Sequence, residues 1–220
     1  MMKKTLLSSA IATALLAATS AQAGVSMNIG VTNNYLWRGV TQTDDGAAVS
    51  GGVDYNHDSG FYVGTWASNV SFGGVADYEL DLYAGYGGEF KDFGYDVGVI
   101  SYQYPIGETY FNEVYANGSF KMISFGVAYT FGSDDDTTAE LSKGDVYGYV
   151  GADFDLAEGY GLSLLVGSYN FDNAAGDDYT HFAVSVSKGD FSIGVEKNDR
   201  TNTGAGEDNP RVVVSWSKEF

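Results

Sequence analysis

Apolar and polar residues alternate one by one along most of this chain, the period-2 pattern of a β-strand that lies between two different environments. The clearest segment sets Tyr78, Leu80, Leu82, Ala84 and Tyr86 against Glu79, Asp81, Tyr83 and Gly85. Carboxylates on one face mean that a soluble core cannot lie on both sides of the sheet. The pattern predicts an all-β fold with one apolar and one polar face on each strand.

Twelve segments of this kind occur in the mature chain, separated by glycine-rich or acidic connections, and we find no helical stretch. The region from Leu36 to Val70 is expected to form two amphipathic strands, reversed by the turn His57-Asp58-Ser59-Gly60. A count of ten strands is the alternative. The expected strands cover residues 25–32, 49–56, 61–67, 78–86, 93–99, 113–117, 123–131, 146–155, 162–166, 181–187, 191–195 and 212–220.

The N-terminus has the three parts of an export signal. Lys3 and Lys4 are a basic n-region, the apolar stretch 6–17 is too short to span a membrane, and Ala21-Gln22-Ala23 is a small-x-small cleavage pattern. We expect export through the Sec pathway, cleavage after Ala23, and one mature domain at residues 24–220. A retained core helix is the alternative.

Composition excludes several classes of function. The signal contains two of the 11 basic residues and none of the 29 acidic ones, so the mature chain has a net charge of −20, which repels nucleic acid. The chain has no cysteine, which excludes disulfides and thiol chemistry. With 44% apolar and 15% aromatic residues, it is too apolar for disorder.

Short and long connections also alternate. Those near His57, Lys91, Lys121, Glu158 and Lys188 are short, whereas most of the others are longer and acidic, including 41–46, 132–144, 171–178 and 198–209. This asymmetry is typical of an up-and-down antiparallel barrel in the bacterial outer membrane, with both termini periplasmic and the apolar faces toward lipid. A soluble β-sandwich is the alternative. Aromatic girdles are expected at Tyr35, Trp37, Tyr55, Tyr78, Tyr86, Tyr95, Tyr129 and Trp216.

The opposite parity predicts which residues line the lumen. Carboxylates dominate this set, so a passage through it favours cations over anions. The tyrosines of the same parity reduce the width of this passage, so that it admits only ions and small polar solutes. The alternative is a barrel whose interior is filled by its own side chains. The predicted pore-lining residues are Arg38, Asp54, Glu79, Asp81, Asp96, Glu113, Tyr115, Tyr147, Tyr149, Asp153, Asp155 and Arg211, and Glu196 shares their parity.

Other chemistry has little support in the sequence. His181 near Ser185 and Asp153 matches the residue types of a hydrolase triad, but a lumen histidine bound to its neighbours explains it better. The run Asp134-Asp135-Asp136 lacks the spaced ligands of a calcium loop. We expect no catalytic residue, metal or cofactor.

The chain resembles the TorF porin family of proteobacteria. The resemblance is most specific in WRGVTQT, GGVDYNHDSGFYVGTW and SNV within residues 36–70, and extends through 78–98 and 111–120. It implies an outer-membrane barrel with passive channel activity and no established substrate.

The C-terminal Phe220, in step with Val212, Val214 and Trp216, resembles the signal read by the barrel-assembly machinery, although Lys218 departs from it. The expected partners are that machinery, outer-membrane lipid and lipopolysaccharide, and small cations or polar solutes. No nucleic acid is expected, and the oligomeric state is left open.

Overall fold

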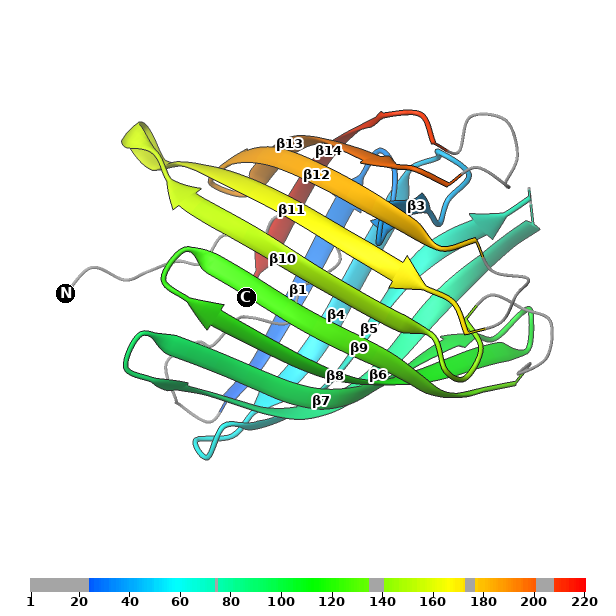
Figure 1. Cartoon of the computed structure of the whole chain (residues 1–220), viewed down its shortest axis with the longest axis horizontal. Helices are drawn as coiled ribbons and strands as arrows, with labels where there is room; N and C mark the ends of the chain where they lie inside the picture. Colours follow the sequence, from blue (N-terminus) through cyan, green and yellow to red (C-terminus); the bar gives the residue numbers. More distant parts are fainter. Residues whose placement is uncertain (1–23, 74, 135–140, 173–176, 201–207) are drawn as a thin grey trace.

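The computed structural model describes residues 24–73, 75–134, 141–172, 177–200 and 208–220. They form a closed barrel whose tilted strands run between two rims (Figure 1). The predicted signal peptide lies outside the described residues, as do Asp135 and Asp136 of the acidic run.

Twelve antiparallel strands form the wall, as the sequence predicts, and the alternative of ten strands is wrong. Each strand pairs with the next one along the chain, and β1 closes the barrel by pairing with both β4 and β14. The wall strands are β1 (Gly24–Thr32), β4 (Ala48–Asn56), β5 (Phe61–Phe72), β6 (Val75–Phe90), β7 (Phe93–Tyr104), β8 (Thr109–Phe120), β9 (Ile123–Ser133), β10 (Val146–Asp155), β11 (Tyr160–Asn170), β12 (Tyr179–Lys188), β13 (Phe191–Asn198) and β14 (Arg211–Glu219).

Apolar side chains cover the outside of the barrel and polar side chains lie inside, the reverse of a soluble protein. On β6, Leu82 is 46% exposed, while the adjacent inward residue Asp81 is 7% exposed. On β9, Val127 is 47% exposed and Ala128 is buried. A single-residue change of register would move every one of these side chains to the wrong face, so the alternation fixes the pairing of the strands.

The short connections lie at the rim where β1 begins and β14 ends (Figure 1). The turn after β4 needs Gly60, whose φ is +95° and whose Cβ would lie 2.3 Å from the Gly87 carbonyl oxygen. The turn after β10 contains a 3₁₀ turn, Ala157–Gly159, although the sequence predicted no helix. Among the described residues, no helix is long and apolar enough to cross a membrane.

Two short strands lie inside the barrel, near the rim away from the termini (Figure 1). They are β2 (Leu36–Trp37) and β3 (Val40–Thr41), which pair as a hairpin in the connection between β1 and β4. We call residues 33–47 the plug loop. Its position contradicts two expectations: residues 36–41 belong to no wall strand, and Tyr35 and Trp37 are buried in the lumen instead of standing in an aromatic girdle.

Candidate functional site in the barrel lumen

Arg38 at the tip of the plug loop is the best-anchored side chain in the lumen. Its Nη1 and Nη2 donate to the two carboxylate oxygens of Glu113 on β8, at 2.7 and 2.6 Å. The guanidinium also lies over the rings of Trp37, Tyr147 and Tyr169, 4.1, 4.3 and 5.3 Å from their centres. A buried bidentate pair of this kind is strong and specific in orientation, so it fixes the loop against the far wall.

The backbone of the hairpin explains how Arg38 reaches that position. Arg38 and Gly39 form the two-residue turn between β2 and β3, with φ of 51° and 84°, as tight hairpins require. A Cβ on Gly39 would lie 2.6 Å from the Cβ of His181, so only glycine fits. The Asn198 side-chain amide donates to the Gly39 carbonyl at 2.7 Å, which holds the tip against β13.

Aromatic rings fill the space around the hairpin. Trp37 makes edge contacts with Tyr102 and Phe111 and a tilted contact with Tyr169, with ring centres 5.7 to 5.9 Å apart. Tyr102 and Phe111 stack on each other at 4.3 Å. These rings come from β7, β8 and β11, so the plug loop, which connects β1 to β4, packs against a different part of the wall and narrows the lumen at this level.

Glu79 and Asp81, two predicted pore-lining residues on β6, lie beside the plug loop and differ in their partners. The hydroxyls of Tyr35 and Tyr104 donate to the two oxygens of Glu79, at 2.8 and 2.7 Å. Asp81 is also buried, but its Oδ1 has no hydrogen-bond partner among the described residues. The two carboxyl groups of Glu79 and Asp81 thus have no basic group bonded to them among the described residues.

His181 makes contacts other than those of a hydrolase triad. Its Nδ1 lies 2.7 Å from Glu196 Oε1 and its Nε2 lies 2.9 Å from the Tyr147 hydroxyl. Asp153, the acid considered for such a triad, instead accepts a hydrogen bond from Ser163 at 2.5 Å. The structure thus does not join His181, Ser185 and Asp153 by hydrogen bonds, and His181 is instead bound between Glu196 and Tyr147.

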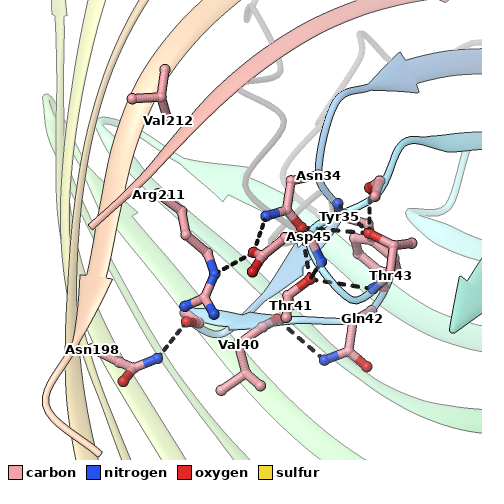
Figure 2. Close-up of polar contacts among 12 residues, drawn as sticks. Asn34, Tyr35, Val40, Thr41, Gln42, Thr43, Asp45, Asn198, Arg211 and Val212 are labelled. Atoms are coloured by element: carbon pink, nitrogen blue, oxygen red, sulfur yellow. Dashed lines mark hydrogen bonds and ion pairs between the residues drawn. The ribbon is translucent and has the colours of Figure 1, made fainter. Parts of the chain in front are cut away.

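The plug loop is also fastened at the rim (Figure 2). Arg211 at the start of β14 donates through Nε to Asp45 at 2.5 Å, and Asn34 donates to the same oxygen at 2.7 Å. Thr41 donates in turn to Asn34 Oδ1 at 2.7 Å. The hydrogen bond from Arg211 holds the pKa of Asp45 below its usual value. Arg211, predicted to line the pore, thus binds the loop.

A layer of tyrosines lies in the lumen nearer the rim of the short connections. Tyr83 donates to Asp54 at 2.5 Å, and Tyr62 donates to Asp96 at 2.7 Å while also contacting the hydroxyl of Tyr115. These groups are half-buried, apart from the buried Asp96 and Tyr115. Asp54 is bound by a hydroxyl, and Asp96 by a hydroxyl and the side-chain amide of Asn117 at 3.3 Å; in the described part of the chain no basic side chain is bonded to either carboxyl group.

The remaining predicted residues are distributed as the parity implies. Tyr147 and Tyr149 stack on each other, with ring centres 6.1 Å apart, and Tyr149 donates to Asn117 at 3.3 Å. Asp153 and Asp155 are exposed near the end of β10. In the residues that the structure describes, no group of three His, Cys, Asp or Glu side chains is arranged to hold a metal ion.

Sequence reasoning missed the lumen role of Tyr35, Trp37 and Asn198. A signal for the hairpin was present, because Arg38-Gly39 stands between Leu36-Trp37 and Val40-Thr41, a two-residue turn with glycine flanked by strand-forming residues. The contacts of that hairpin could not be found in the same way, since they come from strands distant in sequence.

A closed antiparallel barrel with an apolar outer surface and a polar lumen has the architecture of outer-membrane porins. The chain belongs to the Gcw_chp family, described as a bacterial protein of unknown function, whose model matches residues 16–205. The TorF assignment stays a prediction. No curated protein matches the chain.

Solved structures share the fold at low sequence identity. The KdgM porin is 10% identical, with a TM-score of 0.54, over 89% of this chain and 98% of that one. The same porin in complex with disordered oligogalacturonate is 8% identical, with a TM-score of 0.53, over 89% of this chain and 97% of that one. A membrane protein from work on in-meso crystallization is 9% identical, with a TM-score of 0.59, over 90% of this chain and 83% of that one. These likenesses support the fold.

Proposed function

We propose that this protein is a narrow porin-like channel of the bacterial outer membrane that lets ions and small polar solutes diffuse passively and prefers cations. The observation that carries this proposal is the acidic lumen. Glu79, Asp54 and Asp96 accept hydrogen bonds from hydroxyl and amide donors, and in the described part of the chain no basic side chain is bonded to them. Fixed carboxylates around a narrow water-filled path attract cations and repel anions.

The acidic side chains of the lumen also argue against anionic solutes as cargo. Oligogalacturonate, with which the KdgM porin has been solved, is a polyanion, and an acidic lumen repels such a molecule. The plug loop further reduces the width, since Tyr35, Trp37 and Arg38 are buried inside the barrel. We therefore infer small cations and polar solutes as cargo, and no enzymatic activity.

A second function is favoured by a specific observation. The plug loop packs Trp37 against rings of the wall strands β7 and β11 and fixes Arg38 to Glu113. If these contacts seal the lumen, the protein is a non-conducting barrel whose acidic outer loops serve surface structure or adhesion. The two functions differ in a single measurable property, which is conductance.

Single-channel recording of the refolded mature protein in a planar bilayer tests the proposal. A salt gradient should give discrete openings with a reversal potential of the sign expected for cations. Heat-dependent mobility on a gel shows independently that the barrel is folded. Silence from a folded wild type, together with openings from a variant in which residues 35–42 are replaced by a glycine-serine linker, would support the sealed barrel instead.

Location and assembly form a separate part of the proposal. The apolar outer surface fits lipid, and the predicted signal and the terminal Phe220 fit Sec export and insertion by the barrel-assembly machinery. Phe220 is 71% exposed, and its backbone N–H donates to Met27 at 2.8 Å, so its ring is free for recognition. Phe220→Ala should reduce the outer-membrane fraction of the protein in cells without changing its refolding in detergent. An unchanged outer-membrane fraction would contradict this role.

A further inference from the structure

We propose that Asp81, together with Trp66 and Tyr102, forms a binding site for a small organic cation of the alkylammonium class within the lumen. This inference rests on the proposed function and names the kind of solute that the channel favours. It begins with the buried Oδ1 of Asp81, which has no hydrogen-bond partner among the described residues. The residue as a whole is 7% exposed.

The oxygens of the neighbouring carboxylates, Glu79 and Glu113, already accept hydrogen bonds from side chains of the barrel. Glu79, two positions away on β6, accepts hydrogen bonds from Tyr35 and Tyr104. Glu113 accepts hydrogen bonds from Nη1 and Nη2 of Arg38, and one from the Thr130 hydroxyl at 3.5 Å. Glu113 is thus bound by a guanidinium and Glu79 by two hydroxyls, whereas Oδ1 of Asp81 has no partner among the described residues.

A cation is the ligand that such a carboxylate needs. A buried carboxylate without a counter-charge or hydrogen-bond donor is strongly unfavourable. Either a proton or a positively charged group that contacts Oδ1 removes this penalty, and a cationic solute that binds there competes with the proton. Anions and neutral apolar molecules do not remove it.

The flanking side chains decide the class of cation. Asp81 is paired in register with Trp66 on β5 and with Tyr102 on β7, so two aromatic residues flank it on the inner face. Aromatic faces attract organic cations. Divalent metals require several oxygen ligands, and the described residues contain no such cluster. One carboxylate between two aromatic residues matches an alkylammonium ion.

The position of the site connects it to transport. Along β6, Asp81 lies between Glu79, which binds Tyr35 of the plug loop, and Tyr83, which donates to Asp54 of the tyrosine layer. A cation bound at Asp81 is therefore located between the level of the plug loop and the tyrosine layer. Binding there makes Asp81 a specificity-determining residue for the channel.

Methylammonium chloride is the probe for the test, with the full mature protein refolded in detergent. Binding is measured by calorimetry, and methylammonium-to-potassium permeability by the reversal potential in bilayers. Asp81→Asn should weaken binding about tenfold and remove the preference for methylammonium, whereas Asp81→Glu, which keeps the charge, should retain both. Glu89→Gln, which removes an exposed carboxylate from the same strand, is the matched control and should bind as the wild type does.

Each outcome decides between definite alternatives. Equal losses in Asp81→Asn and Glu89→Gln would overturn the site and leave only a general effect of charge. Wild-type binding by a folded Asp81→Asn protein would overturn it as well. A wild type that binds methylammonium through Asp81 but never conducts would refute the channel and leave the site standing, so the two failures are distinguishable.

Discussion

At the scale of single residues, the lumen is governed by which charges have partners. Arg38 and Glu113 form a buried bidentate pair, whereas Glu79 is bound only by hydroxyls. Asp45 and Arg211 form another pair at the rim, where Asp45 remains 57% exposed. The buried pair of Arg38 and Glu113 determines the position of the plug loop. The pair of Asp45 and Arg211 is in contact with solvent, so the protonation of Asp45 can follow the pH of the medium.

Arg38→Met leaves Glu113 buried without its partner. We expect this substitution to lower the free energy of unfolding by about 3–5 kcal/mol and to raise conductance, because the loop loses its anchor. Urea unfolding in lipid vesicles and bilayer recording measure the two effects. In the double variant Arg38→Met with Glu113→Leu, most of the stability should return, because no buried charge remains. A double variant as unstable as the single one would show that the loss comes from packing.

Protonation of Asp45 should loosen the plug loop. Because Arg211 lowers the pKa of Asp45 in the folded protein, this contribution to stability is fully present above the ordinary Asp pKa of about 3.9. It is lost as the pH falls through the lower pKa of the folded state.

Bilayer recordings between pH 3 and 6 should therefore show more frequent loop-dependent current fluctuations at the acidic end. Asp45→Asn should show them already at neutral pH, since its side chain cannot take a negative charge. If the variant kept the wild-type dependence on pH, another group would be responsible.

At the scale of elements, the β2–β3 hairpin behaves differently from the wall strands. Each wall strand is held by two neighbours along its length. The hairpin has four residues in its strands, and its position is fixed by Arg38 and Asn198 together with packing of Trp37. Because β1 pairs directly with β4, we expect the barrel wall to close without the hairpin.

Gly39→Ala tests this independence. The φ of +84° and the approach of the new methyl group to His181 at 2.6 Å should displace the hairpin at a cost of about 1–3 kcal/mol. We expect higher conductance with the heat-dependent gel mobility of a folded barrel. Gly148→Ala on β10 is the control, because its Cβ would meet nothing nearer than 3.7 Å. Loss of the folded gel form in Gly39→Ala would show that the hairpin is needed for the wall.

At the scale of the whole molecule, the barrel is inverted relative to a soluble protein. Apolar residues such as Leu82 and Val127 are exposed around the outside, and carboxylates such as Glu79 and Glu113 are 1% exposed inside. This distribution is stable only where the outer surface meets hydrocarbon, since water outside would leave a large apolar area exposed.

A charge on the outer surface checks that environment. Val127→Lys in the middle of β9 should destabilise the barrel in lipid vesicles by about 2–4 kcal/mol, the usual cost near the bilayer midplane. Val127→Ile should leave the stability nearly unchanged. A Lys variant as stable as the wild type would mean that this face does not contact lipid, and would count against the outer-membrane location.

The sequence alone determined the wall of this barrel. Period-2 alternation gave the number of strands and the inward parity of Glu79, Asp81 and Glu113, because each strand meets a uniform apolar medium on one side. The turn signals near His57, Lys91 and Lys121 gave the asymmetry of the rims. These features depend on local pattern and on an environment that is the same for every strand.

Only the tertiary structure decided what occupies the lumen. The partners of Arg38, Trp37 and Gly39 come from β7 to β13, and no periodicity relates those positions to the hairpin. Closure of the wall brings them within contact distance of one another. The same closure leaves Asp81 with an unpartnered oxygen while Glu79, two residues away with the same parity, is fully bound. Parity specifies the face of a strand, and closure of the barrel specifies which groups meet across its interior.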